Sequence, residues 1–294
     1  MMMKRLFRSV RGVGLVTMFL VAVLLVSCNN DKKGSNINKI TYDSVVVRQH
    51  VPLLEVNDTT MPYSDLQVVF TYPTKFGDAE QLKRLQQIFT GTFFNDRSYD
   101  EMLPKDAVDE YVNKYTSNYQ ELSNDFYKSM ELIEDKDQMP MWFWYERYLS
   151  NTVLFENDSL VSYMVESSTY EGGAHGSYSR VYTNIDLNEL VVLTEEDLFV
   201  PNYFKPLRDK IIDALMKENS VTEPDSLLNK GFFTLEDIVP NNNFQLNDEG
   251  FRYVYNQYEI APYSMGVIEV LIPYSELEDI LIPDGFINKV FLKK

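Results

Sequence analysis

The chain has 294 residues, of which 45% are hydrophobic and 14% aromatic, and these proportions exclude a mainly disordered or fibrous protein. Its 44 acidic residues outnumber 27 basic ones, giving a formal net charge of -17. This charge argues against nucleic-acid binding, because a phosphate backbone attracts clustered cations. The single cysteine excludes an internal disulfide framework, a four-cysteine zinc site and an iron–sulfur cluster.

Residues 1–27 have the organisation of a secretory signal peptide. Four basic residues precede the apolar run Val13–Val26, which is shorter than the roughly 20 residues of a membrane span. The run ends in Leu25-Val26-Ser27-Cys28, which resembles the lipobox of bacterial lipoproteins. We therefore expect cleavage before Cys28, whose thiol carries the lipid. The alternative is a short N-terminal anchor helix with an incidental cysteine.

A lipid on Cys28 places the protein in the bacterial cell envelope, anchored in a membrane. Because Asn29 rather than an aspartate follows Cys28, we expect delivery to the outer membrane, and the periplasmic or surface face stays open. Residues 29–38 are polar and lack periodicity, which is typical of a flexible tether, so we assign residues 28–40 to the lipidated cysteine and this tether. Cleavage removes four basic residues and no acidic ones, so 23 basic and 44 acidic residues remain and the net charge becomes -21.

Residues 41–165 form the first predicted module. Leu66–Tyr72 is rich in β-branched and aromatic residues and predicts a strand. Asp78 begins a sequence that resembles a helix capping box, followed by apolar residues at helical spacing. Pro104 starts a longer helical pattern, which predicts one helix running to about Ile133.

From residue 141 the apolar pattern changes to a period of two. It predicts three successive antiparallel strands at Met141–Phe155, Leu160–Tyr170 and Tyr178–Leu187. In the third strand we expect one set of side chains to face the core, namely Val181, Thr183, Ile185 and Leu187. The opposite set is Tyr178, Arg180, Tyr182 and Asn184.

Residues 166–294 form the second predicted module, packed with the first as one unit. The acidic run Glu195–Asp197 favours the start of a short helix over a calcium site, because the helix dipole stabilises acids there. A helix follows at Tyr203–Glu218, with Phe204 among its inward residues. Closing strands are predicted at Phe244–Leu246, Phe251–Glu259 and Val267–Ile272. Together these elements indicate an α+β fold, an antiparallel sheet with helices packed mainly on one face.

The chain has few residues for acid–base or metal chemistry. His50 and His175 are its two histidines, and neither lies in an H-E-x-x-H or comparable zinc spacing. The sequence has no G-x-S-x-G elbow, Walker loop or G-x-G-x-x-G. We therefore predict no catalytic residue, no cofactor and no metal site.

The Gly-rich turn at residues 172–176 is the most informative internal feature. Its glycines permit positive φ and a close backbone approach, which a plain hairpin loop also requires. The functional interpretation is a binding surface on which aromatic side chains meet a partner. The candidate partner-binding residues are Tyr170, Gly172, Gly173, His175, Tyr178 and Tyr263.

Two blocks of sequence resemble a known family. The first begins with YEGGAHG at residues 170–176 and continues through NIDL to LTEEDLF. The second is YEIAPYSMG at residues 258–266, followed by IPYSEL. Both are similar to the extracellular domain of the RsiV family of lysozyme-sensing anti-sigma factors, and residues 64–165 are similar to the module that precedes it, also found in the deacetylase PdaC. The chain as a whole resembles a Bacteroidota-type lipoprotein, and the tripeptides that begin at Asp43, Asp58, Asp158 and Asp225 resemble the short O-glycosylation sequon of Bacteroidota exported proteins.

The resemblance implies an extracytoplasmic α+β module that binds proteins or envelope components. We expect no anti-sigma signalling role, because only three residues precede the basic segment, and no deacetylase domain. The leading hypothesis is a non-enzymatic envelope lipoprotein that binds a cationic protein such as lysozyme, with no nucleic-acid partner. The alternatives are an envelope glycan-acting enzyme that uses carboxylates, and a structural envelope protein.

Overall fold

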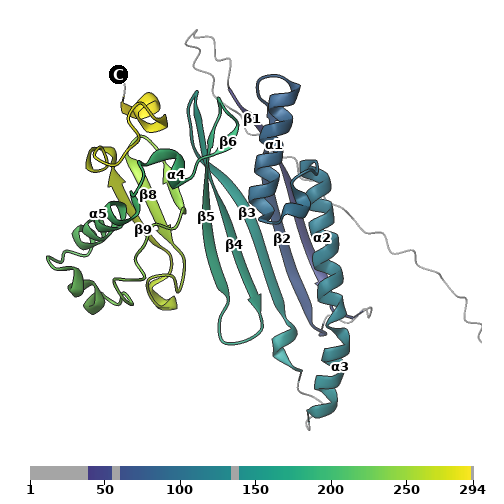
Figure 1. Ribbon diagram of the computed structural model, residues 1–294. Helices are drawn as coiled ribbons and strands as arrows, with labels where there is room; N and C mark the ends of the chain where they lie inside the picture. The colour runs from purple at the N-terminus through teal and green to yellow at the C-terminus, as the bar shows by residue number, and fades with distance from the viewer. Residues whose placement is uncertain (1–38, 55–59, 134–138, 293–294) are drawn as a thin grey trace, which may run out of the picture. The chain divides into compact units, whose positions relative to one another are not determined.

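The computed structural model describes residues 39–54, 60–133 and 139–292. Cys28, the signal peptide and residues 28–38 of the tether lie outside these residues, so their assignments stay predictions. Asn36–Lys294 form a compact unit by themselves. This unit contains a six-stranded sheet, a three-stranded sheet and several helices, which confirms the α+β class (Figure 1).

The larger sheet has the strand order β1-β2-β3-β4-β5-β6. Its strands are β1 (Thr41–Pro52), β2 (Tyr63–Lys75), β3 (Tyr145–Glu156), β4 (Leu160–Glu171), β5 (Ser177–Asp186) and β6 (Val191–Val192). Neighbouring strands are antiparallel except β2 and β3, which run parallel with Ser64 opposite Tyr145. The sequence pattern predicts β2, β4 and β5 well, whereas it gives no indication of β1 or of the parallel pair.

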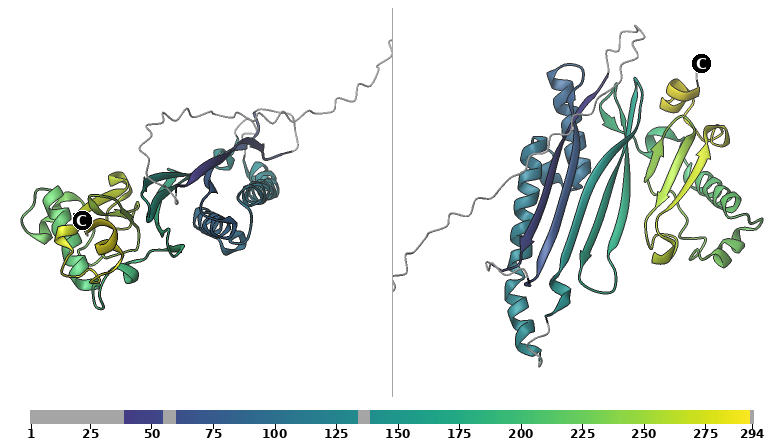
Figure 2. Two further views of the ribbon diagram at one scale, coloured as in Figure 1. Left: turned by 90° about the horizontal axis from the view of Figure 1, so that it is seen from above. Right: turned by 180° about the vertical axis from the view of Figure 1, so that it is seen from behind.

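The crossover between the parallel strands β2 and β3 carries the helices that form the first hydrophobic core with the larger sheet. These are α1 (Ala79–Phe94), η1 (Arg97–Tyr99), α2 (Pro104–Glu121), α3 (Ser123–Leu132) and η2 (Met141–Phe143). They lie on one face of the sheet (Figure 2), where Leu85, Phe89 and Val108 pack against apolar residues of β2 to β5. The Asp78 capping box is confirmed, since its side chain accepts hydrogen bonds from the first turn of α1.

Two predicted elements of this region differ from the structure. The helix expected from Pro104 to about Ile133 is broken at Leu122, where α2 ends and α3 begins at the next residue. The strand expected from Met141 begins instead at Tyr145, because residues 141–143 form a 3-10 turn.

The smaller sheet consists of β7 (Phe244–Leu246), β8 (Gly250–Tyr255) and β9 (Ile268–Pro273), all antiparallel. Around it lie α4 (Glu195–Leu198), α5 (Phe204–Glu218), η3 (Pro224–Lys230), η4 (Tyr263–Met265), η5 (Tyr274–Glu276) and η6 (Asn288–Leu292). Leu207, Ile211 and Leu215 of α5 are buried in the second core. Phe204, predicted to point inward, is exposed, although its spacing to Leu207 and Ile211 is that of the buried stripe, because it is the first residue of α5, at the end of the helix.

β5 corrects the prediction about its two faces. Thr183, Ile185 and Leu187 are buried as expected, but Val181 is 47% exposed. On the opposite side, Tyr182 and Asn184 are buried, because the smaller sheet approaches β5 there. The side chains that a simple alternation assigns to solvent therefore belong to the junction between the two sheets.

Candidate functional site

The Gly-rich turn joins β4 to β5 and depends on its glycines. Gly172 and Gly173 have φ of +75° and +107°, values that favour glycine. A Cβ on Gly172 would lie 2.4 Å from the carbonyl oxygen of Trp142, and one on Gly176 would lie 2.6 Å from that of Thr169. The turn is thus held against the η2 segment, and a side chain on Gly172 would force these two backbones apart.

His175 projects from this turn onto tyrosines of the second sequence block. Its ring stacks on Tyr263, with 4.1 Å between the ring centroids. The hydroxyl of Tyr258 lies 3.4 Å from His175 Nε2, and the Tyr258 and Tyr263 centroids are 6.0 Å apart. Tyr258 is 56% exposed. We call His175, Tyr258 and Tyr263 the aromatic cluster.

The other candidate residues divide between the turn and the sheet junction. The Tyr170 hydroxyl donates to the Gly173 carbonyl across the turn, at 3.1 Å. Tyr178 points instead into the junction, where its hydroxyl donates to the Glu166 carboxylate and accepts from Arg180 Nε. Burial and the bond to Glu166 raise the pKa of Tyr178. The structure therefore brings His175 and Tyr263 together and separates Tyr178 from them.

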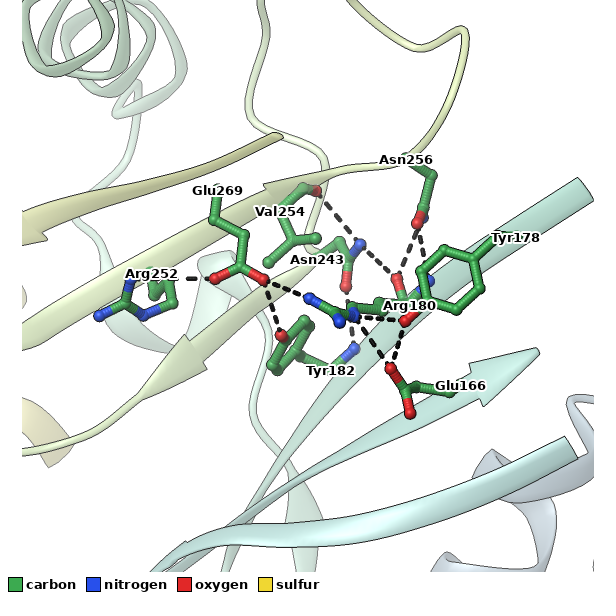
Figure 3. A network of polar contacts seen from close by, with 9 residues as sticks. All are labelled: Glu166, Tyr178, Arg180, Tyr182, Asn243, Arg252, Val254, Asn256 and Glu269. Carbon is green, nitrogen blue, oxygen red and sulfur yellow. Dashed lines mark hydrogen bonds and ion pairs between the residues drawn. The ribbon is translucent and has the colours of Figure 1, made fainter. Parts of the chain in front are cut away.

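The junction is built around Arg180 of β5 (Figure 3). Its guanidinium bonds to Glu166 of β4 at 3.1 Å and to Glu269 of β9 at 2.8 Å. Glu269 also lies 3.8 Å from Arg252 of β8. Because one cation bridges carboxylates from both sheets, this network fixes how β5 and the smaller sheet meet.

Side-chain amides from the segments that flank the smaller sheet bond to the outer backbone edge of β5. The N–H groups of Tyr178, Arg180 and Tyr182 donate to the side-chain oxygens of Gln257, Asn256 and Asn243 in turn, at 2.7 to 3.0 Å. Asn243 and Asn256 also donate to the Arg180 carbonyl, at 2.9 and 3.0 Å. We call Asn243, Asn256 and Gln257 the amide ladder (Figure 3 shows the first two), because these side chains satisfy the backbone groups that a neighbouring strand would satisfy.

Glu195, the first residue of α4, is a buried carboxylate. Asn242 N–H donates to it at 2.8 Å, and the hydroxyls of Tyr253 and Tyr203 donate at 3.2 and 3.3 Å. Burial is the main cause that raises the pKa of Glu195. The expected short helix is confirmed as α4, with Thr194 and Asp197 forming its capping box. Among the described residues there is no group of three or more His, Cys, Asp or Glu side chains that would hold a metal ion.

An open groove of about 530 Å³ crosses β1 to β4. Its polar lining includes Arg48, His50, Asp65 and Glu146, and His50 Nδ1 lies 2.9 Å from the Asp65 carboxylate. The two carboxylates in this lining, Asp65 and Glu146, are both exposed to solvent. Within the described ranges, no helix has the length and apolar character that crossing a bilayer requires.

Comparisons with known proteins divide the chain in two. Residues 196–275 match DUF3298, a family of proteins of unknown function. Residues 66–178 match the family of the deacetylase PdaC. No curated protein matches the chain.

Two solved structures resemble the chain. The crystal structure of a DUF3298 family member from Bacteroides fragilis is 29% identical, with a TM-score of 0.79, and the match covers 85% of this chain and 96% of that one. The crystal structure of a DUF3298 family protein from Pseudomonas aeruginosa is 19% identical, with a TM-score of 0.56, and covers 85% and 97%. At this identity the second comparison shows a shared fold.

The sequence prediction missed several residues of the site. Tyr258 lies in the same YEIAPYSMG block as the candidate Tyr263, so membership of this block could have identified it as a site residue. Arg180, Asn243 and Asn256 had no comparable signal, because polar side chains on alternate strand positions and in loops usually meet solvent.

Proposed function

We propose that this chain is a non-enzymatic, lipid-anchored protein of the bacterial envelope that binds a cationic protein through the aromatic cluster. The observation that carries the proposal is the His175–Tyr263 stack with the exposed Tyr258 beside it. Lysozyme is the test partner, as implied by the resemblance to the RsiV family.

The geometry of the cluster supports a role in recognition. Three rings from two distant segments meet at the surface, and Gly172 holds the turn that carries one of them against η2. Tyrosine supplies a large contact area at a small cost in side-chain entropy, and its ring face also attracts cations. The arrangement therefore suits the insertion of a basic or apolar side chain from a partner.

The charge of the chain supports a cationic partner. After cleavage at Cys28 the predicted net charge is -21. An excess of this size speeds the encounter with a basic protein and repels acidic ones, and salt weakens the effect. The segments that match DUF3298 and PdaC overlap the two segments that resemble the RsiV family, which is consistent with the proposal.

The deciding experiment is a calorimetric titration of residues 29–294 with lysozyme at low and moderate salt. We expect saturable binding that weakens as salt rises. Tyr258→Leu should weaken it, whereas Tyr127→Leu is the matched control, because Tyr127 on α3 is similarly exposed at 54%. Absence of saturable binding at both salts contradicts the proposal, as does an equal effect of the two variants.

The enzymatic alternative has its own test. Peptidoglycan fragments incubated with the same protein should stay intact, and they should also stay intact with His175→Ala. Turnover by the wild-type protein would contradict the non-enzymatic part of the proposal and leave binding to be judged separately.

A further inference from the structure

The two edges of the six-stranded sheet are treated differently by this fold. On one side the sheet ends in the two-residue β6, and the amide ladder satisfies the outward backbone groups of β5 from Tyr178 to Tyr182. β1 ends the sheet on the other side and has no strand beyond it in the described part of the chain. β1 pairs with β2 over twelve residues, from Thr41 to Pro52.

The outer edge of β1 carries outward-pointing backbone groups. The N–H of Ser44 bonds to the Asp43 carboxylate at 2.8 Å and not to β2. Since hydrogen-bonding direction alternates along an antiparallel strand, the N–H groups of Val46, Arg48 and His50 point away from β2 as well. Such a row of groups is a template for pairing with another strand.

Most features that protect natural sheet edges are missing along the middle of β1. The register with β2 is regular from Tyr42 onward, its one proline is the last residue, Pro52, and it has no lysine. Its centre is Val45-Val46-Val47, and Val46 is 47% exposed beside Val69 on the outer face of the sheet. A regular edge with an apolar centre, which no strand covers within the described residues, favours association.

We propose that β1 pairs antiparallel with β1 of a second copy of this chain, about a twofold axis at Val46. The strand is complementary to itself in this register. Val46 meets Val46 on the outer face, and Val45 meets Val47 on the helix-covered face. Registers shifted by one residue in the axis position place the Asp43 carboxylate opposite Val47 or Val51, which pairs a charge with an apolar side chain.

Charge favours a second copy at this edge over a basic partner. Asp43 and Arg48 cancel within β1, so the strand carries no net charge, in contrast to the acidic chain as a whole. A strand without net charge does not attract a basic protein. Across the proposed twofold axis it places β-branched valines opposite each other, a pairing that stabilises antiparallel strands. Repulsion between the two acidic bodies opposes the dimer, so salt should strengthen it.

Cross-linking tests the pairing and its register. Residues 29–294 lack Cys28, so Val46→Cys introduces the only thiol, and two such thiols face each other at the twofold axis within disulfide range. We expect rapid oxidation of V46C to a covalent dimer. V181C is the matched control, because Val181 has the same 47% exposure on β5. A mixture of S44C and R48C should form the heterodimer faster than either variant forms a homodimer.

Sedimentation velocity of the chain without added cysteines gives an independent readout. Wild-type dimerisation should grow with concentration and with salt, and Val46→Lys should weaken it by roughly tenfold, which corresponds to about 1.4 kcal/mol. Val181→Lys should leave it unchanged. A wild-type chain that stays monomeric at millimolar concentration, or cross-linking of V46C no faster than that of V181C, overturns the proposal. Neither result bears on lysozyme binding.

Discussion

Glu195 couples protonation to folding at the scale of a single residue. It is 1% exposed, and its carboxylate accepts one backbone and two tyrosine hydrogen bonds. Burial nevertheless outweighs these bonds and raises its pKa above the ordinary value of 4.5. The folded protein therefore holds this proton at pH values where the unfolded chain has released it.

The sign of the resulting pH dependence follows. As pH rises from 4.5 through the raised pKa, the unfolded state binds fewer protons than the folded state, so this group lowers the free energy of unfolding. Urea unfolding across this range should show that loss in the wild-type protein, and Glu195→Gln should lack it. The control is E196Q, which changes an exposed neighbour on the same helix. Parallel profiles for wild type and E195Q would contradict the assignment.

The turn glycines provide a second prediction for single residues. Gly172→Ala and Gly173→Ala both place a Cβ at positive φ, at a cost of about 1 to 2 kcal/mol each. Only G172A also collides with the Trp142 backbone, since nothing lies within 4 Å of the Cβ position at Gly173. We expect G172A to lose about 1 to 3 kcal/mol more unfolding free energy than G173A. Chemical denaturation measures both, and equal losses would contradict the contact.

At this scale the sequence predicted the type of residue but not its neighbours. His175 and Tyr263 were both candidates, from the turn and from the resemblance, and the structure stacks them. Their contact is long-range, and no periodicity specifies which loop of the larger sheet meets which loop of the smaller sheet. Tyr178 carried the same signals as His175 and lies in the junction instead.

Between elements, the amide ladder gives the most direct test of the junction. Asn256 accepts from Arg180 N–H and donates to its carbonyl, so Asn256→Ala removes two backbone hydrogen bonds. We expect a loss of about 1 to 3 kcal/mol, at 0.5 to 1.5 kcal/mol per bond. Hydrogen exchange should show faster exchange of the Arg180 amide in N256A.

Asn219→Ala is the control for the ladder. Its side-chain amide donates to the Leu215 carbonyl at the end of α5, away from β5. This variant should lose some stability without changing exchange at Arg180. If both variants leave the Arg180 amide equally protected, the ladder is not what shields that edge.

Element boundaries show where the sequence pattern was sufficient. The Asp78 capping box and the strand at β4 rest on local signals, and both are confirmed, although the burial of β4 does not alternate as predicted: its first half is buried throughout and its second half is half-buried. The break between α2 and α3 left no trace, because the apolar stripe continues across Leu122. β1 was missed because an edge strand exposes residues on both faces, which removes the alternation.

For the whole molecule, the acidic charge determines how salt affects thermal stability, self-association and lysozyme binding. Screening at about 0.1 M shortens the range of repulsion to about 10 Å. Thermal unfolding of residues 29–294 should therefore shift to higher temperature between low and moderate salt, because the folded chain concentrates its acidic excess. Differential scanning calorimetry measures the shift. Self-association should strengthen over the same range and lysozyme binding should weaken. A melting temperature that falls with salt would contradict this view of the charge.

The register of the sheet also determines how the protein bears force. β1 begins with Thr41 opposite Lys75, at one end of the sheet, and the Gly172 turn follows Glu171 opposite Tyr145, at the other end. In the proposed function a membrane holds the chain ahead of Thr41 and a partner holds the turn. A pull between these points runs along β1 and loads its hydrogen bonds to β2 together, in shear. Unzipping would break these hydrogen bonds one at a time. In shear they share the load, so the sheet resists a pull between the membrane and a bound partner with all of them at once.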